Sequence, residues 1–295
     1  MYERLTKCPL CKSEHFINQL VVKDHAISKE SFIICACKNC DLWFTNPRPS
    51  EKNINGYYDK PNYISHQQDS KSLKDLIYHS VRKYTIRQKL NWINKRVKKK
   101  GRIMDYGCGV GLLAKAFSEN GWDAYGIEPN EKAATIANID NGVNIIETQK
   151  ELLKQKKFDA ITLFHVLEHV HKLNKTLALL LNRLKKRGIL FIAVPNRESQ
   201  DAIKFKENWA AFDVPRHLYH FNKDSIHYLT QKHNCKVIDT IPMIFDSYYV
   251  SLLSHEYSGS PGKYWKALQT GYLSNQYAKQ NDNNYSSLLY VIRKK

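Results

Sequence analysis

Four cysteines near the N-terminus have the spacing of metal ligands. They form two C-x-x-C pairs, Cys8 with Cys11 and Cys37 with Cys40. Each pair can bring two thiolates to one metal ion from a tight turn, and two such turns complete the tetrahedral four-sulfur site that zinc accepts. Sites closed by four thiolates are structural rather than catalytic. The spacing therefore predicts a zinc-binding module, although Cys35, beside the second pair, leaves the ligand assignment open.

A glycine-rich loop at residues 102–111 is the second stretch with chemical meaning. A short apolar strand is expected to end at Asp105, and residues 112–120 are expected to form a helix. The loop between them holds three glycines: Gly107, Gly109 and Gly111. Glycine lets the backbone turn sharply and lets a ligand approach closely. The next expected strand ends in Glu128, where a carboxylate can bind the two hydroxyls of a ribose.

The residues of this loop favour one cofactor over another. The G-x-G-x-G spacing differs from the G-x-G-x-x-G of dinucleotide-binding loops, and Asp105 would repel a pyrophosphate. A cofactor with a cationic sulfonium and an amino-acid head would instead be attracted. The loop therefore points to S-adenosylmethionine rather than to NAD.

From residue 102 to the C-terminus the chain resembles the class I S-adenosylmethionine-dependent methyltransferases. The matching stretches are residues 105–111, 128–129, 158–169 and 188–195. The resemblance implies an α/β, Rossmann-like fold, a seven-stranded sheet with helices on both faces, here preceded by a small zinc ribbon. It also implies a set of cofactor-binding residues: Asp105, Gly107, Gly109, Glu128 and His165.

Other elements must position these residues. We expect strands at 121–127, 144–147, 158–164, 188–194, 236–241 and 288–293, with a helix at 173–184. The family resemblance implies that the last two strands pair as an antiparallel hairpin. A hairpin is also expected between the cysteine pairs, because residues 12–36 exceed the usual ligand spacing. The predicted domains are a zinc-binding module at 1–50, a linker with a basic helix at 51–100, and the methyltransferase domain at 101–295.

Residues 209–221, after the fifth expected strand, would face the methyl acceptor in the layout of this family. His217 and His220 are the candidate catalytic residues, since histidine is a suitable base near neutral pH and residues three apart share a face of a helix. The alternative is that Asp213, Arg216 and the histidines form a structural corner. This stretch also resembles the C-methyltransferases of nucleotide-linked deoxysugars, in which a histidine matching His217 takes part in proton removal.

A third resemblance concerns residues 165–171, which read His-Val-Leu-Glu-His-Val-His. The ubiquinone-pathway O-methyltransferases have Glu-x-x-Glu-His here, and that group is linked to a divalent ion. His165 replaces the first acid in this chain. The alternative is that Glu168 and His169 cap a helix and line the cofactor pocket.

The charge of the chain bears on its partners. Lys and Arg number 46 against 28 Asp and Glu, a net charge of +18. Residues 71–102 hold 12 Lys or Arg and one acid, Asp75, and apolar residues recur at helical spacing between residues 73 and 97, which predicts a basic helix. Such a helix can face solvent, an anionic membrane surface or nucleic acid. We expect an anionic small-molecule substrate. An RNA substrate is less favoured because the motifs of base methylation are missing. A binding protein without activity is the least favoured alternative, because Asp105, the glycine loop and Glu128 are all present.

No apolar run is long enough to cross a bilayer, and the N-terminus does not read as a signal peptide. These features predict a cytoplasmic protein. The oligomeric state cannot be inferred from the sequence.

Overall fold

The computed structural model describes residues 1–58 and 73–295, without the side chains of 73–80. The chain divides into two compact units. The first unit comprises Met1–Tyr63, His165–Leu177 and Ala193–Tyr290; the second comprises Ile64–Phe164, Ala178–Ile192 and Val291–Lys295. The predicted domain boundaries at residues 50 and 100 stay predictions.

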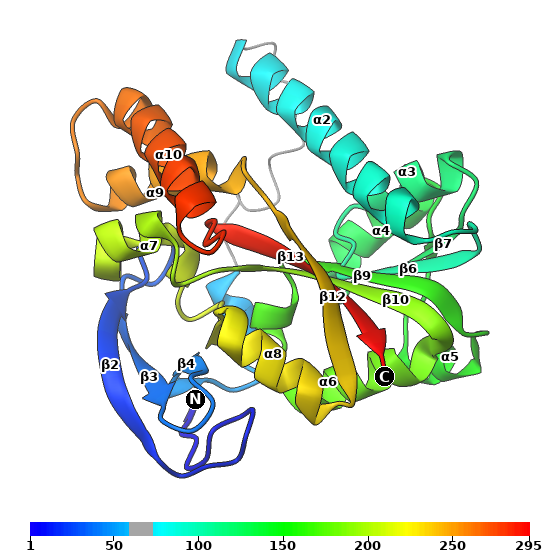
Figure 1. Cartoon of the computed structure of the whole chain (residues 1–295), viewed down its shortest axis with the longest axis horizontal. Helices are drawn as coiled ribbons and strands as arrows, with labels where there is room; N and C mark the ends of the chain where they lie inside the picture. The colour runs from blue at the N-terminus through cyan, green and yellow to red at the C-terminus, as the bar shows by residue number, and fades with distance from the viewer. Residues whose placement is uncertain (59–72) are drawn as a thin grey trace. The chain divides into compact units, whose positions relative to one another are not determined.

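Seven strands of the described residues form one sheet, in the order β12-β13-β10-β9-β6-β7-β8 (Figure 1). Their bounds are β6 Arg102–Tyr106, β7 Asp123–Ile127, β8 Asn144–Ile145, β9 Phe158–Phe164, β10 Leu184–Pro195, β12 Cys235–Pro242 and β13 Ser287–Lys294. The β6 strand pairs in parallel with β7 and β9, and β7 with β8. Figure 1 shows β12 and β13 running in opposite directions. The predicted α/β sheet is thus confirmed.

The second half of strand β10 is buried on both faces of the sheet. Residues 188–195 of β10 are an apolar run, and every one of them is buried, as is typical of parallel strands covered on both faces.

Five helices of the described residues lie between residues 73 and 183 and belong to this sheet's part of the sequence. They are α2 Leu73–Arg96, α3 Leu112–Glu119, α4 Glu131–Ile139, α5 Gln149–Lys154 and α6 Leu173–Arg183. The helices predicted at 112–120 and 173–184 begin at the first residues of α3 and α6 and extend one residue beyond their last residues. Residues 71 and 72 of the expected basic helix lie outside the described residues.

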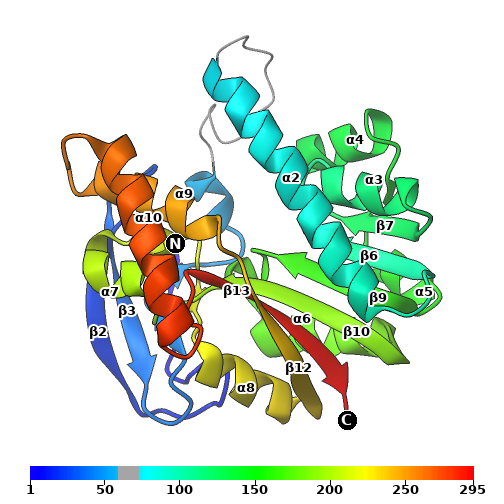
Figure 2. The same cartoon turned by 45° about the horizontal axis from the view of Figure 1, so that its top comes forward.

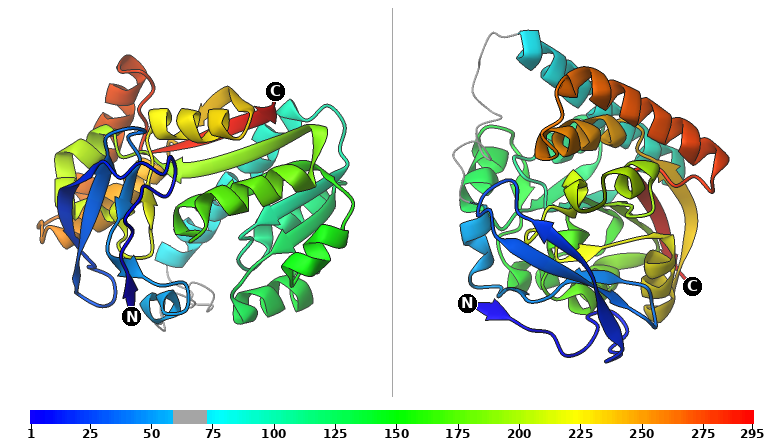
Figure 3. Two further views of the ribbon diagram at one scale, coloured as in Figure 1. Left: turned by 90° about the horizontal axis from the view of Figure 1, so that it is seen from below. Right: turned by 90° about the vertical axis from the view of Figure 1, so that its left-hand side faces the viewer.

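A second sheet belongs to the first unit. It has the order β11-β4-β3-β2 among the described residues, with β2 Phe16–Lys23, β3 Ser31–Cys37, β4 Trp43–Thr45 and β11 Tyr219–His220. The β2–β3 hairpin, visible in Figure 3, confirms the hairpin expected between the cysteine pairs. A two-stranded sheet joins β1 Tyr2–Glu3 to β5 Arg48–Pro49.

The pairing of β11 corrects one expectation. Tyr219 pairs with Phe44 and His220 with Trp43 in antiparallel register. The segment that carries His217 and His220 is therefore a loop that enters a strand, and the two histidines do not share a helical face. Residues 219–220 adopt an extended conformation because they pair with the edge of the N-terminal sheet at β4.

The remaining helices of the first unit are η1 Ile54–Tyr57, η2 Leu167–His169, α7 Gln200–Phe205, η3 Lys206–Asn208, η4 Ala210–Phe212, α8 Lys223–Lys232, α9 Asp246–Tyr257 and α10 Lys263–Gln280. Helices α9 and α10 lie between β12 and β13 in the sequence and pack side by side (Figure 2). The core of this unit joins Val22 and Ile34 of the hairpin to Trp209, Phe212 and Val214. The N-terminal sheet thus packs on the segment that leads to His217.

Candidate functional site

The glycine loop and the end of β6 form a candidate cofactor site within the second unit. Asp105 is buried, and its Oδ1 accepts a hydrogen bond from the Thr162 hydroxyl at 2.6 Å. Burial raises the pKa of Asp105 to about 6, against the opposing effect of the Thr162 hydrogen bond. Gly109 has a φ of 55°, and no atom lies within 4 Å of a Cβ built there. The loop therefore leaves open space beside a buried carboxylate.

Glu128 ties this loop to the next strand. Its Oε2 accepts a hydrogen bond from the Gly109 N–H at 2.9 Å, and its Oε1 accepts one from Asn130 N–H at 2.9 Å. The backbone N–H groups of Gly107 and Cys108 both donate to the Ile127 carbonyl. Four predicted cofactor residues, Asp105, Gly107, Gly109 and Glu128, are thus brought together at the carboxyl ends of β6 and β7, where ligands of this sheet type bind.

His165 follows β9 directly and has a φ of 57°, a conformation that costs a non-glycine residue energy and is concentrated at functional sites. Its Nε2 lies 3.0 Å from Asp246 Oδ2, and its Nδ1 lies 3.5 Å from Glu168 Oε1. Burial would lower the pKa of His165, but Asp246 and then Glu168 raise it to about 9. His165 is therefore a cation at neutral pH. Its contact with the cofactor stays a prediction.

Glu168, His169 and His217 form a compact cluster in the first unit. The Glu168 side chain is fully buried, and neither of its oxygens has a hydrogen-bond partner among the described residues. One donor atom from each of the three residues lies within 4.8 Å of the others. Burial would raise the pKa of Glu168, but His165 and the other imidazoles lower it below its usual range. The cluster thus contains a buried carboxylate that stays ionised.

A hydrogen bond indicates which nitrogen of the His217 ring carries the proton, and His169 has two polar contacts at one nitrogen. His217 Nδ1 lies 2.8 Å from the Ala211 carbonyl oxygen. A carbonyl only accepts, so Nδ1 of neutral His217 carries the proton and Nε2 carries the lone pair. His169 Nδ1 lies 3.0 Å from the Arg216 carbonyl and 2.9 Å from the Tyr58 hydroxyl, and burial, then His217, lowers the pKa of His169 to about 4. Both rings can therefore offer Nε2 as a base or a metal ligand.

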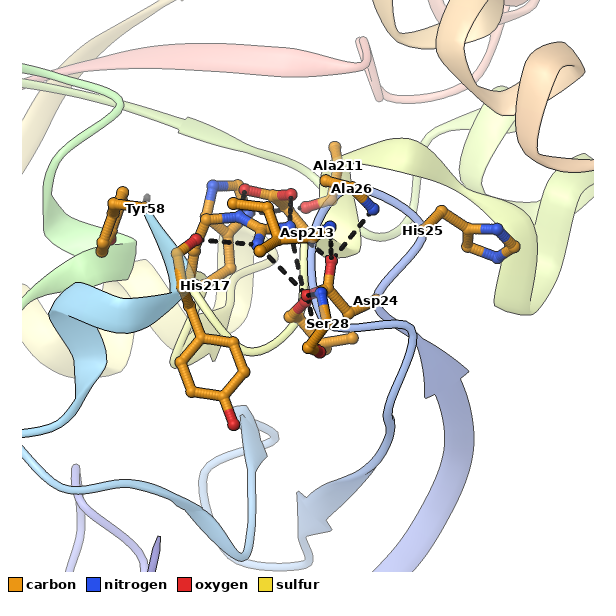
Figure 4. A network of polar contacts seen from close by, with 12 residues as sticks. Asp24, His25, Ala26, Ser28, Tyr58, Ala211, Asp213 and His217 are labelled. Carbon is orange, nitrogen blue, oxygen red and sulfur yellow. Dashed lines mark hydrogen bonds and ion pairs between the residues drawn. The ribbon is translucent and has the colours of Figure 1, made fainter. Parts of the chain in front are cut away.

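Arg216 is committed to a buried ion-pair network with Asp24 and Asp213, two residues that Figure 4 labels. Its Nη2 lies 2.6 Å from Asp213 Oδ1 and 3.0 Å from Asp24 Oδ1. Asp24 also accepts hydrogen bonds from the backbone of its own turn, at Ala26, Ile27 and Ser28. Since the Arg216 side chain is 1% exposed, it holds the hairpin turn against the 213–217 segment and is not free to bind an anionic acceptor.

His220 has a different environment from His217. Its Nε2 lies 3.1 Å from the Thr45 hydroxyl, which itself donates to the His217 carbonyl. Burial, followed by the charges of His217 and Arg197, lowers the pKa of His220 well below its usual range. This arrangement is that of a hydrogen-bonded corner, and the catalytic roles of His217 and His220 stay predictions.

The four predicted zinc ligands also meet. Cys8 and Cys40 have sulfurs 3.6 Å apart, Cys11 and Cys37 have sulfurs 3.5 Å apart, and all four lie within 4.8 Å of one another. Tetrahedral zinc with Zn–S bonds of about 2.3 Å sets sulfurs about 3.8 Å apart, so the group fits the ion. Cys35 is excluded from the ligand set, because its sulfur faces Asn18 and the Asn46 carbonyl.

Sequence reasoning missed two partners of the site. Asp246, at the first turn of α9, contacts His165, and Tyr58 contacts His169. Neither residue belongs to a motif, and each is far from its histidine in the sequence. Finding Asp246 and Tyr58 from the sequence would have required predicting the tertiary contacts of α9 and of the linker.

These features define a methyltransferase of the S-adenosylmethionine-dependent class. A family model described as a methyltransferase domain matches residues 78–240, more than half of the chain, and the chain belongs to this family. Ubiquinone biosynthesis O-methyltransferase of Pseudomonas fluorescens strain Pf0-1 is 30% identical over 118 residues, 37% of this chain and 51% of that protein. The enzyme of the same name from Rickettsia canadensis is 29% identical over 41% of this chain and 55% of its own length. The chain spans about half the length of these curated relatives.

Solved structures support the fold. Magnesium protoporphyrin IX methyltransferase from Synechocystis PCC 6803, with bound S-adenosylhomocysteine, superposes with a TM-score of 0.53 at 13% identity, covering 82% of this chain and 98% of that one. The [4+2]-cyclase SpnF gives a TM-score of 0.51 at 16% identity, covering 84% and 98%. Because two proteins with different activities share this fold, the methyl acceptor has to be inferred from the side chains of the site.

Proposed function

We propose that this protein transfers a methyl group from S-adenosylmethionine to an oxygen or carbon atom of a small, anionic metabolite. The observation that carries the proposal is that His217 lies close to Glu168, with one ligand atom of each within 4.8 Å of the other. His217 presents a ring nitrogen with a free lone pair beside a buried, ionised carboxylate. The net charge of +18 favours an anionic acceptor, and the curated relatives act on a small molecule by their names.

In this reaction the acceptor atom bonds to the methyl carbon as the bond from that carbon to sulfur breaks, and S-adenosylhomocysteine leaves. The protein must align the two reactants and accept the proton of the acceptor. His217 Nε2 takes that proton. Glu168 then stabilises the imidazolium, because an ionised carboxylate nearby favours the charged ring.

Cofactor binding is assigned to the loop at the ends of β6 and β7. Asp105 attracts the cationic part of S-adenosylmethionine, the backbone of Gly107 and Gly109 lines the methionine part, and Glu128 accepts hydrogen bonds from the ribose. Each carboxylate oxygen of Glu128 already accepts one backbone N–H, and each has a second lone pair for a hydroxyl.

Zinc at Cys8, Cys11, Cys37 and Cys40 has a structural role in this proposal. The ion would lock the two cysteine turns and thereby the strands β3 and β4, whose edge carries β11. It would take no part in methyl transfer, because four thiolates leave no open coordination position.

The cluster of Glu168, His169 and His217 offers one alternative route to the same product. Two imidazoles and a carboxylate also suit a divalent cation, which would polarise the acceptor as a Lewis acid. The two routes differ in metal dependence. Turnover that is neither raised by added Mg²⁺ or Mn²⁺ nor lost when these ions are withheld, with the zinc left in place, supports the histidine as base.

The test is an acceptor screen that detects S-adenosylhomocysteine release. Pools of phosphorylated sugars, nucleotide-linked sugars, phenolic acids and RNA are offered to the protein with S-adenosylmethionine. We expect release with an anionic small-molecule pool, and that release should vanish in His217→Asn while His227→Ala, an exposed histidine of α8, retains it. Release with RNA alone would contradict the proposal.

A further inference from the structure

Helix α10, Lys263–Gln280, is packed with its small residues inward. The buried residues of this helix are Ala267, Thr270, Gly271, Ser274, Asn275 and Ala278. The contact with α9 is close, since a Cβ built at Gly271 would lie 2.6 Å from a ring carbon of Tyr248. A surface helix ordinarily turns its large apolar residues toward the core, and α10 does the opposite.

The large apolar residues of α10 face outward instead. Trp265 is 75% exposed, Leu268 56%, Tyr272 54%, Leu273 51% and Tyr277 43%. Trp265, Leu268 and Tyr272 follow one another at i, i+3 and i+7, so their side chains form one stripe. Single exposed apolar residues are ordinary, but a continuous stripe of this kind marks a surface that binds something. These five residues are called the outer face of α10 below.

The chemistry of the helix selects the partner. Its sequence holds three lysines, Lys263, Lys266 and Lys279, and no Asp or Glu, in a chain with net charge +18. Three of the five outer-face residues are Trp or Tyr, whose ring is apolar and whose N–H or O–H prefers water, as at a membrane interface. Packing two copies of this face together would set like charges against each other. Lys263 is paired with Glu256 of α9 at 2.8 Å, so the charge match to an anionic lipid surface rests on Lys266 and Lys279 beside the aromatic anchors.

We propose that the outer face of α10 docks on an anionic lipid bilayer, with the helix lying in the plane of the interface. No helix of the described residues is long and apolar enough to cross a membrane, so this contact would be peripheral. The proposal goes beyond methyl transfer and does not depend on which atom is methylated. It concerns a different surface from the basic segment at residues 71–102.

Vesicle co-sedimentation tests this proposal with the full-length protein. Vesicles of phosphatidylcholine with phosphatidylglycerol are compared with pure phosphatidylcholine vesicles at 0.1 M salt. We expect binding to the anionic vesicles that weakens as salt rises. The variant Trp265→Ser/Leu268→Ser should bind them at least about tenfold more weakly, because it removes two apolar side chains that would be buried in the bilayer. The control Ile139→Ser, at an apolar residue of α4 that is 74% exposed, should bind as the wild type does.

Thermal melting and S-adenosylmethionine affinity are measured on each variant, so that loss of fold or cofactor binding is separated from loss of docking. Binding that is equal in the double variant and the wild type would overturn the proposal. Absent binding to anionic vesicles would overturn it as well. A dimer seen by light scattering that the double variant abolishes would assign the face to a second copy instead.

Discussion

At the scale of single residues, two buried carboxylates, one in each unit, hold their charges differently. At Asp105 burial outweighs the Thr162 hydrogen bond and the charge of Lys89, and the pKa rises to about 6. At Glu168 the neighbouring imidazoles outweigh burial, and the pKa is lowered. The two carboxyl groups should therefore respond differently to pH.

The Asp105 carboxyl predicts a pH dependence of cofactor affinity. A pKa of about 6 means that Asp105 loses its proton between pH 5 and pH 7, and only the ionised form attracts the cationic cofactor. Affinity for S-adenosylmethionine should be about tenfold weaker at pH 5 than at pH 7. Calorimetry at both pH values measures this, and Asp105→Asn should flatten the dependence. An equal slope in the variant would refute the assignment.

Glu128 predicts a direct loss of affinity. Glu128→Ala removes the ribose acceptor and the anchor of the Gly109 N–H, and should weaken S-adenosylmethionine binding by about 1.5–3 kcal/mol, the range for hydrogen bonds to a charged group. Glu131→Ala, an exposed acid of the same neighbourhood, serves as the matched control. Unchanged affinity in Glu128→Ala, measured by calorimetry, would remove Glu128 from the cofactor site.

The pair His165 and Asp246 predicts a pH dependence of stability. The folded pKa of His165, about 9, lies above its ordinary value of 6.5. The pair therefore stabilises the fold fully below pH 6.5, and this stability is lost as pH rises through 9. Melting temperatures of Asp246→Asn should lie below those of the wild type at pH 6 and converge with them near pH 10. A gap of constant size, as expected for an exposed control such as Asp140→Asn, would show that the two groups are not coupled.

At the scale of elements, the strands beside the cysteine pairs and the strand that carries His220 belong to one sheet. Strand β11 pairs with β4, and β4 pairs with β3, which ends at Cys37. Thr45 of β4 also donates to the carbonyl of His217. Order in the cysteine turns should therefore reach the candidate base through backbone hydrogen bonds.

Zinc removal tests this link. Because a structural zinc site contributes folding energy locally, a chelator should speed hydrogen exchange in β3, β4 and β11 more than in β6. Elemental analysis of protein prepared without chelator should find one zinc per chain, retained in Cys35→Ser and lost in Cys37→Ser. No zinc in the wild type, or equal exchange in all four strands, would contradict the assignment.

The sequence predicted those elements whose signals are local. The glycine loop, β9 and α6 carry their residue types at short spacing, so their positions could be read directly. The pairing of β11 with β4 joins residues 175 apart, and no local pattern encodes such an encounter. Helix α10 was not predicted because its large apolar residues face outward. The spacing of apolar residues along this helix therefore does not mark a face that packs on the core.

At the scale of the whole molecule, the sheet supports many reactions, and the chemistry depends on a few added side chains. The family match shows a methyltransferase, while the fold itself is shared with a cyclase. In this chain the candidate side chains are the cluster of Glu168, His169 and His217, held by contacts from η2, the linker residue Tyr58 and the N-terminal sheet. The central claim is therefore that His217 accepts the proton during methyl transfer.

His217→Asn tests that claim most directly. An asparagine amide can replace the Nδ1–H bond to the Ala211 carbonyl but has no counterpart of Nε2, so the segment keeps its anchor and loses only the base. With the acceptor found by the screen, turnover should fall by about 10²–10⁴-fold, while S-adenosylmethionine affinity and melting temperature stay close to those of the wild type. Full turnover in this variant would contradict the account, whatever its melting temperature.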